Sequence, residues 1–182
     1  MYTLHKIRAR PNVAVIRAIH PAELDAVRGF MRDLVEWLFE RHHQYIDLVR
    51  RYFDPNEFDA ELKNLPGDFA SPKGVLLLAL VSNDYAGCVG LRDLGEGVCE
   101  MKRLYVDPVY HGHGIGEALV EASISQAQYL GYSKMRLDTG PKQVEARGLY
   151  AKMGFTPIPA YYDLSAEMED WLTFMEYDLT YE

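Results

Sequence analysis

Residues 101–116 read MKRLYVDPVYHGHGIG. A strand-like pattern runs to Val106, and Asp107-Pro108 stops it because proline cannot donate to a ladder. Glycines then occupy positions 112, 114 and 116, just before a helical pattern. A helix N-terminus carries unpaired N–H groups and partial positive charge, and glycines let an anion approach that backbone. The stretch predicts a phosphate site. For a glycine pattern standing alone, a flexible loop that caps a surface helix is the alternative.

Two well-known phosphate motifs do not fit this stretch. The P-loop is excluded because no Gly-Lys-Ser/Thr follows the glycines. The dinucleotide fingerprint is a poor match, because it needs a βαβ start and an acidic residue about 20 positions later at a strand end.

Hydrophobic periodicity and turn residues divide the rest of the chain into short elements. We predict strands at residues 13–19, 75–81, 86–94, 98–106, 135–139, 155–158 and 171–179. We predict helices at residues 21–39, through 45–52, from Asp54-Pro55 onwards, and at 117–130 and 143–153. A tyrosine-rich loop separates the last two strands. This order predicts an α/β fold with a mixed central sheet, built as one domain over residues 1–182.

Composition limits the function classes that fit. The 19 Lys and Arg against 27 Asp and Glu give a net charge of −8, which disfavours a nucleic-acid binder. The longest apolar run, residues 75–81, is far short of the ~20 residues that span a membrane, and the N-terminus lacks the apolar region of a signal peptide. We therefore expect a cytoplasmic protein with no nucleic-acid or membrane partner. A homodimer is compatible with the sequence.

The chain has two cysteines, too few for a disulfide scaffold or a Cys-rich zinc site. Cys88 and Cys99 fall on predicted neighbouring strands, and we expect both to be reduced. His42 and His43 are adjacent and lack the i, i+4 spacing of a zinc pair on a helix, so no metal is expected.

The stretch that ends in Val106-Asp107-Pro108 and continues through residues 111–116 resembles the acetyl-CoA-binding motif of the GNAT superfamily of N-acetyltransferases, Q/R-x-x-G-x-G/A. The departure is His111, which stands in place of Gln or Arg. A second block, LYAKMGF at residues 149–155, is similar to the family's L-Y-x-x-x-G-F. The predicted element order also matches this family across nearly the whole chain.

The resemblance implies that acetyl-CoA, as co-substrate, lies in a V-shaped gap where strands 98–106 and 135–139 splay apart. Backbone groups of Leu104 and Val106 would pair with the pantetheine arm, and amides of the glycine-rich turn would hold the pyrophosphate. Gln143 occupies a position often held by Asn. The implied coenzyme-binding residues are Leu104, Tyr105, Val106, His111, Gly112, His113, Gly114, Ile115, Gly116, Glu117 and Gln143.

His111 leaves two alternatives open. A neutral imidazole donates a hydrogen bond but supplies no fixed charge, so it would make acetyl-CoA affinity depend on pH. Otherwise the ring faces solvent and the backbone alone binds the anion.

The resemblance also assigns two catalytic residues. Tyr150 lies at the position of the general acid, whose hydroxyl donates to the leaving sulfur; the alternative is a core tyrosine on an amphipathic helix. Glu100 lies where the histone-acetylating members carry their base. Alternation puts Glu100 on one face with Lys102, Leu104 and Val106, unless a bulge intervenes. An ion pair of Glu100 with Lys102, or across the strands, is the structural alternative.

The acceptor is harder to predict. The family builds its acceptor pocket from the first helices, the strand with Glu100 and the C-terminal hairpin, here residues 37–52 and 161–177. Residues 41–45 could line it, and Lys102 and Arg103 could bind an acidic group. Tyr161, Tyr162 and Trp171 could form an aromatic wall or simply pack a loop. We interpret Arg136 and Asp138 as partners in ion pairs.

Three functions remain. The leading hypothesis is an N-acetyltransferase that moves the acetyl group of acetyl-CoA to an amine by direct attack in a ternary complex. Its expected acceptor is a small amine or an amino acid; a protein N-terminus or lysine stays open. Absence of a clear Cys–His pair argues against a covalent acetyl-enzyme. The alternative is a non-catalytic acyl-CoA sensor or partner-binding module on the same fold.

Overall fold

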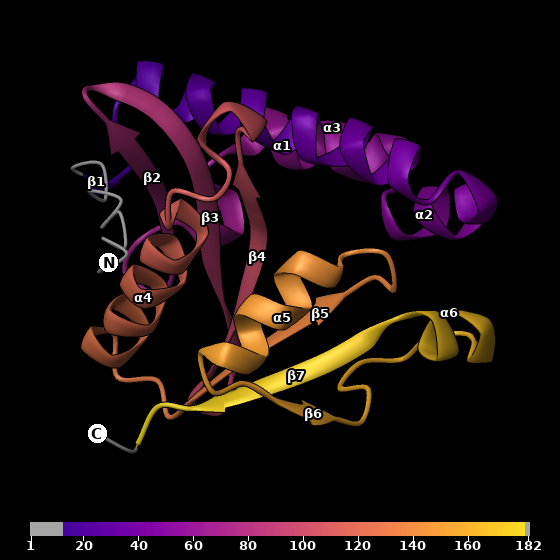
Figure 1. Cartoon of the computed structure of the whole chain (residues 1–182). Coiled ribbons are helices and arrows are strands. Elements are labelled where there is room, and N and C mark those ends of the chain that lie inside the picture. Colours follow the sequence, from indigo (N-terminus) through magenta and orange to yellow (C-terminus); the bar gives the residue numbers. More distant parts are fainter. Residues whose placement is uncertain (1–12, 181–182) are drawn as a thin grey trace, which may run out of the picture.

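The computed structural model describes residues 13–180. Within these residues, seven strands form one sheet in the order β1-β2-β3-β4-β5-β7-β6 (Figure 1). The pairing is antiparallel except between β4 and β5, which confirms the predicted mixed sheet. The strands are β1 (Val13–Arg17), β2 (Val75–Val81), β3 (Asp84–Gly95), β4 (Val98–Val106), β5 (Lys134–Thr139), β6 (Thr156–Ile158) and β7 (Thr173–Asp178).

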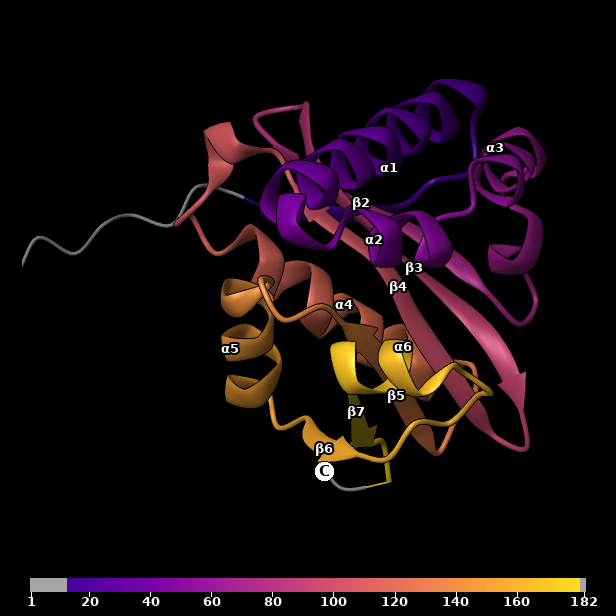
Figure 2. The ribbon, with the colours of Figure 1, turned by 90° about the vertical axis from the view of Figure 1, so that its right-hand side faces the viewer.

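Helices cover both faces of this sheet (Figure 2). On one face, Ile115 and Leu119 of the helix that spans residues 115–129 pack against the sheet in one core cluster. On the opposite face, Val27 and Met31 of the first helix pack against the sheet in a second cluster. The helices are α1 (Pro21–Arg41), α2 (Ile46–Tyr52), α3 (Pro55–Asn64), α4 (Ile115–Tyr129), α5 (Val144–Lys152) and α6 (Ala166–Trp171), with 3₁₀ turns η1 (His43–Tyr45), η2 (Gly67–Phe69) and η3 (Pro108–Tyr110). No helix within residues 13–180 is long and apolar enough to cross a membrane.

Local sequence signals explain most helix starts. Pro21 opens α1, and the Glu23 carboxylate accepts hydrogen bonds from the amides of Ile19 and His20. Asp54 caps α3 by accepting from the amides of Asn56 and Glu57. The predicted helices at these positions are therefore confirmed, with ends that differ by a few residues.

Helix α6 is a correction, because its residues were predicted as part of the tyrosine-rich loop and the start of a strand. Ser165 caps α6 by accepting from the amide of Met168, and Glu167 and Glu169 lie in its first turn. Both features favour a helix start. The last strand therefore begins at Thr173, two residues later than predicted.

Strands β4 and β5 part after a short stretch of pairing. Their register runs from Val98–Lys134 to Glu100–Arg136 and no further. Beyond Glu100, β4 stays paired with β3 as far as Val106, and β5 stays paired with β7 as far as Thr139. The predicted splayed parallel pair is confirmed, and the gap opens directly after the candidate base.

A β-bulge in β4 overturns the simple alternation of side chains. Gly90 pairs with Lys102 and Cys88 with Tyr105, so two residues of β4, Arg103 and Leu104, lie opposite one residue of β3. Arg103 takes the left-handed conformation there, with φ of 60°.

The bulge reverses the faces of the residues that follow it. Leu104 and Val106 pack in the cluster on the α4 face, not beside Glu100 and Lys102. Tyr105 turns instead toward α1, where its ring lies 6.0 Å from that of Phe30.

Cys88 and Cys99 are both buried, and no disulfide joins them. Although β3 and β4 are neighbours, Cys88 lies opposite Tyr105 and Cys99 opposite Asp93. Burial raises the pKa of each thiol to about 12. Both therefore behave as small apolar core residues at neutral pH.

The close approach of β3 to the bulge can be tested at Gly87. A Cβ there would lie 2.4 Å from the carbonyl oxygen of Tyr105, whereas a Cβ at Gly29 in α1 would meet nothing within 4 Å. We expect Gly87→Ala to lower the free energy of unfolding by about 2 kcal/mol through overpacking. Gly29→Ala should raise it by about 0.5–1 kcal/mol through helix propensity. Urea denaturation measures both, and equal stabilities would contradict the packing described for the bulge.

Candidate active site

The glycine-rich turn ends in a helix start that is open to an anion. Gly112 and Gly114 have φ of 76° and 80°, and a Cβ at either would meet nothing within 4 Å. The first hydrogen bond of α4 runs from the amide of Ala118 to the carbonyl of Gly114, so Ile115 and Gly116 lack an intrahelical acceptor. The buried side chain of Ile115 anchors this end of α4 in the core. These features fit the coenzyme pyrophosphate.

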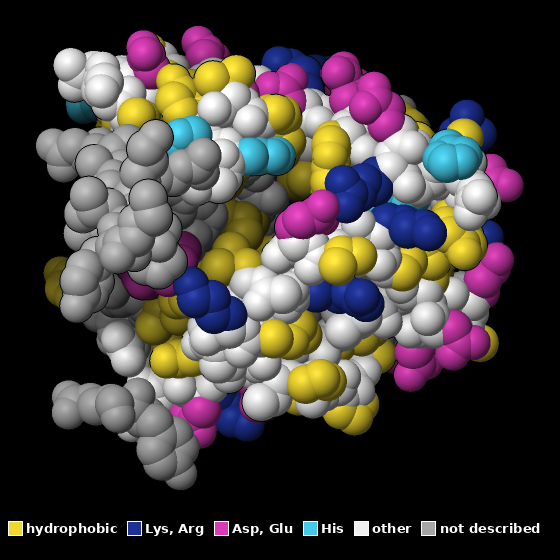
Figure 3. Space-filling model, viewed as in Figure 1, with side chains coloured by type: hydrophobic (Ala, Val, Ile, Leu, Met, Phe, Trp, Pro, Cys, Tyr) yellow, Lys and Arg dark blue, Asp and Glu magenta, His cyan; other side chains and the backbone are white. Residues whose placement is uncertain are grey.

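His111 does not simply face solvent. Its Nε2 lies 2.9 Å from the carbonyl oxygen of Val106, the backbone group assigned to the pantetheine arm. The amide of His113 makes a long bond of 3.4 Å to the carbonyl of Tyr110. Figure 3 shows histidine side chains beside this turn, next to a hollow with a hydrophobic floor. Behind the turn, Glu117 is paired with Lys152 of α5 at 2.8 Å.

A small cavity of about 50 Å³ lies where β4 and β5 have parted. Its walls include Leu104, Gln143 and Tyr150, so the structure brings three predicted site residues together. Gln143 accepts a 2.6 Å hydrogen bond from the amide of Gly140, which orders the turn before α5.

Tyr150 is buried, and its hydroxyl makes no hydrogen bond to any residue between 13 and 180. Burial, aided by the negative charge of Asp138, raises the pKa of this phenol well above its usual value. Tyr150 therefore keeps its proton at neutral pH and presents an unused donor to the cavity.

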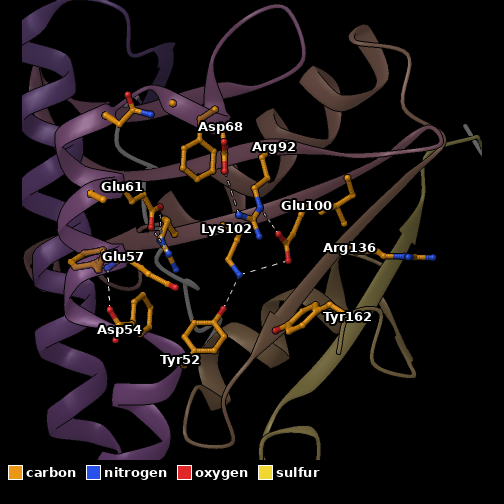
Figure 4. Close-up of a pocket in the computed structure, with 18 of the residues that line it drawn as sticks. Tyr52, Asp54, Glu57, Glu61, Asp68, Arg92, Glu100, Lys102, Arg136 and Tyr162 are labelled. Carbon is orange, nitrogen blue, oxygen red and sulfur yellow. Dashed lines mark hydrogen bonds and ion pairs between the residues drawn. The ribbon is translucent and has the colours of Figure 1, made fainter. Parts of the chain in front are cut away.

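A second cavity, of about 1000 Å³, lies on the other side of β4 (Figure 4). Helices α2 and α3, strands β3 and β4 and the tyrosine-rich loop enclose it. Its lining begins at Arg51, so residues 41–45, predicted as a lining segment, lie outside it. The two cavities share Tyr52, Phe53, Lys102 and Arg103, which form the wall between them.

Glu100 lines the large cavity although only 1% of its surface is exposed. Its Oε2 accepts from Nε of Arg92 at 2.6 Å, across the strand pair, and its Oε1 accepts from the hydroxyl of Tyr161 at 2.6 Å. Nζ of Lys102 lies 3.7 Å from Oε1. The ion pairs of Glu100 with Lys102 and with Arg92 across the strands, given above as the structural alternative to a role as base, are both present. The carboxylate nevertheless lies at the cavity.

Asp138 is the second buried carboxylate, with 2% of its side chain exposed. It accepts from Lys102 Nζ at 3.2 Å, from the hydroxyl of Tyr162 at 2.9 Å and from the hydroxyl of Tyr52. Burial alone would raise the pKa of Asp138, but the Lys102 charge and these hydrogen bonds hold it below its usual value.

Lys102 therefore joins the two carboxylates into one network. Figure 4 shows its links to Glu100 and to Tyr52. Its Nζ also donates to the hydroxyl of Tyr52 at 2.9 Å. The interpretation of Asp138 as an ion-pair partner is correct. Tyr52 and Tyr162 both fall in segments predicted to build the acceptor pocket, and both line the large cavity. Their hydrogen bonds to Asp138 were not predicted, because contacts between distant segments leave no local pattern.

The cations around the large cavity are already paired. Arg103 donates twice to Glu61, at 3.0 and 2.6 Å, and stacks 4.7 Å from the ring of Phe53. Arg136 and Arg51 pair with Glu176 and Glu167, each at 2.8 Å. This argues against the alternative in which Lys102 and Arg103 bind an acidic group.

Three carboxylates of the lining are left without a cation. Asp54, Glu57 and Glu96 have no ion-pair partner among residues 13–180. Because the paired cations are neutralised, the remaining charge of the wall is negative.

The three aromatic residues predicted near the acceptor pocket, Tyr161, Tyr162 and Trp171, lie at two different cavities. Tyr161 and Tyr162 line the large cavity and pack edge-on against Phe174. Trp171 lies instead on the small cavity, edge-on to the ring of the buried His42.

Comparison with known proteins identifies the family. The Acetyltransferase (GNAT) family model matches residues 32–155, and this chain belongs to that family. It is 41% identical over 106 residues to an uncharacterised N-acetyltransferase of Schizosaccharomyces pombe, with 57% of the chain and 65% of the relative covered. It is 36% identical over 104 residues to the peptidyl-lysine N-acetyltransferase YjaB of Salmonella typhimurium, with 57% and 64% covered. The chain thus spans slightly under two thirds of these relatives.

Solved structures agree on the fold. A GNAT-family acetyltransferase of Staphylococcus aureus superposes with a TM-score of 0.67 at 18% identity, covering 92% of this chain and 99% of the other. The PaiA N-acetyltransferase of Thermoplasma acidophilum, solved with coenzyme A, gives the same TM-score, identity and coverage. Among residues 13–180, no group of three or more His, Cys, Asp or Glu side chains could hold a metal ion.

Because Lys102 belongs to a buried network and Lys73 to an exposed ion pair, replacing these two lysines should lower the free energy of unfolding by different amounts. Lys102→Met leaves two buried carboxylates with less compensation, and we expect it to lower the free energy of unfolding by about 3 kcal/mol. Lys73→Met breaks an exposed pair with Asp93 and should cost about 1 kcal/mol or less. Urea denaturation at pH 7 compares them. Similar costs would contradict the importance of the buried network.

The same network predicts a pH dependence. Because the pKa of Asp138 is lowered on folding, its contribution to stability is present above its unfolded pKa of about 4 and is lost as pH falls through the folded value. The native protein should therefore lose more stability than Lys102→Met as pH falls below about 4. Urea midpoints measured from pH 6 to pH 2.5 test this, and parallel curves would show that Lys102 does not set the pKa of Asp138.

Proposed function

We propose that this chain transfers the acetyl group of acetyl-CoA to the nitrogen of a small cationic amine, by direct attack in a ternary complex. One observation supports this most. A cavity that presents the unused Tyr150 donor meets a larger cavity lined by Glu100, across a shared wall. Family membership supplies the reaction class.

The open helix start of α4 and the parted strands fit acetyl-CoA, which supplies the activated acyl group when bound. Amides of Gly114, Ile115 and Gly116 would hold the pyrophosphate, and Gly112 and Gly114 leave room for it. Backbone groups of Leu104 and Val106 would meet the pantetheine arm, with Gln143 at the wall of the small cavity. His111 would hold the Val106 carbonyl in place.

Tyr150 acts in this proposal as the general acid. It keeps its proton because its pKa is raised, and its hydroxyl has no acceptor within residues 13–180. It would donate to the sulfur as negative charge develops there.

Glu100 acts as the base, directly or through water, by taking a proton from the acceptor nitrogen. Arg92 and Tyr161 fix the orientation of its carboxylate. The carboxylate faces the large cavity, from which the acceptor would come.

The charge of the large cavity narrows the class of amine expected as acceptor. Within the described part of the chain, the arginines and Lys102 of this wall are paired, and Asp54, Glu57 and Glu96 have no cationic partner. The wall therefore favours an amine with a second positive group over an amino acid, whose carboxylate would meet no unpaired cation there. A lysine side chain is the second candidate, since the relative YjaB is named a peptidyl-lysine N-acetyltransferase. We place this activity in the cytoplasm without a nucleic-acid partner, and leave a homodimer as compatible with it.

The catalytic roles are tested by Tyr150→Phe and Glu100→Gln. We expect Tyr150→Phe to lower kcat about 100-fold, because it removes the proton donor but keeps the ring, with little change in the KM for acetyl-CoA. Glu100→Gln should lower kcat/KM about 100-fold, with the largest loss at low pH where the amine is protonated. Coenzyme A release measured with a thiol reagent gives the rates. An unchanged rate for Tyr150→Phe would contradict its role as acid.

The acceptor class is tested with matched amines at equal concentration. We expect kcat/KM to be about tenfold higher for a diamine than for a monoamine of equal length, and higher still than for the corresponding amino acid. Glu57→Gln should reduce the ratio of kcat/KM between the diamine and the monoamine. Glu40→Gln, which changes an exposed glutamate outside the cavity, is the control and should leave that ratio unchanged. Binding of acetyl-CoA with no turnover of any amine or lysine peptide would favour the sensor instead.

A further inference from the structure

The indole nitrogen of Trp171 is an unexplained polar atom. It has no contact with solvent and no hydrogen-bond partner among residues 13–180, where Oγ1 of Thr139 is the only other fully shielded side-chain N or O atom without a partner. An indole N–H can only donate, and a buried donor without an acceptor destabilises the fold. Such an atom in a native protein calls for a ligand or an ordered water.

The ring of Trp171 packs among apolar side chains and against His42. Trp171 is the last residue of α6, and its ring lies 5.2 Å from that of His42 at an interplanar angle of 66°. His42 has its own partners, with Nδ1 3.1 Å from the carbonyl of Leu38 and Nε2 3.3 Å from the amide of Lys142. The packed position of the indole therefore leaves its N–H without an acceptor within residues 13–180.

Trp171 lines the small cavity that also contains Tyr150. Two side chains with unused donors thus meet at one cavity, from α5 and from α6. Asp138 lines the same cavity and stays anionic, which disfavours an anionic ligand group and favours a neutral acceptor. A thioester has two neighbouring acceptor atoms, the sulfur and the carbonyl oxygen.

We propose that the indole N–H of Trp171 donates a hydrogen bond to the carbonyl oxygen of the acyl thioester, while Tyr150 serves the sulfur. The inference rests on the acyl-coenzyme binding proposed above. It makes Trp171 a residue that distinguishes acyl-coenzyme A from free coenzyme A, a role different from both the aromatic wall and the loop packing considered from its sequence.

Equilibrium binding tests this with a substitution that keeps an aromatic ring. Trp171→Phe removes the N–H, and calorimetric titration should show about tenfold weaker binding of acetyl-CoA and less than a twofold change for coenzyme A. Trp37→Phe is the control, because Trp37 stacks with Arg41 at 5.1 Å and lines neither cavity. It should leave both affinities unchanged.

A second measurement needs no change at position 171. The chain has two tryptophans, so Trp171 is the only one in Trp37→Phe. Acetyl-CoA should then change the tryptophan fluorescence more strongly than coenzyme A does. This readout stays valid even if Trp171→Phe fails to fold.

The outcomes separate the two proposals. Failure of the native protein to bind acetyl-CoA would overturn the proposed function. Normal binding by the native protein with equal affinity in Trp171→Phe would overturn the inference alone. An equal loss for acetyl-CoA and coenzyme A would also overturn it, because the N–H would then contact the coenzyme arm and not the acyl group. An equal change in the fluorescence of Trp37→Phe on adding acetyl-CoA or coenzyme A would also overturn the inference.

Discussion

The separation of β4 from β5 after Glu100 is the constraint on which the rest of this site depends. It leaves β4 paired only with β3 beyond that residue, and it opens the cavity at which Tyr150 lies. The bulge at Arg103 then turns Leu104 and Val106 to the α4 face while Lys102 and Arg103 stay with Glu100. One strand thereby lines two cavities: Leu104 lies on the small one, Glu100 on the large one, and Lys102 and Arg103 form the wall that both share.

A buried polar network stabilises the wall between these cavities. Lys102 connects Glu100 and Asp138, and hydroxyls of three tyrosines complete the carboxylates. Because breaking a buried pair costs far more than breaking an exposed one, the geometry of the wall is tightly specified. Lys102 and the arginines around the large cavity are each paired with a carboxylate. The ion pairs that stabilise this region therefore also leave the cavity with the negative charge on which the proposed acceptor preference depends.

The sequence predicted the fold well because strong local signals mark its elements. Residues 75–81 and 98–106 form strands with the predicted ends, and Asp107-Pro108 followed by glycines marks the start of α4. The bulge at Arg103 was not predictable, since a non-glycine residue with positive φ has no local signature. The places of Trp171 and Tyr52 depend on contacts between distant segments. Helix α6 had a signal in Ser165 and the acidic residues after it, which the tyrosines around it obscured.

We propose that the parted strands and the start of α4 form one coenzyme site. Hydrogen exchange of the backbone amides, measured with and without coenzyme A, shows whether both segments respond to the same ligand. We expect slower exchange at residues 104–106 and 114–116 when coenzyme A is present, with no change in α1 or α3. Unchanged exchange in both segments at saturating coenzyme A, or protection confined to other parts of the chain, would contradict it.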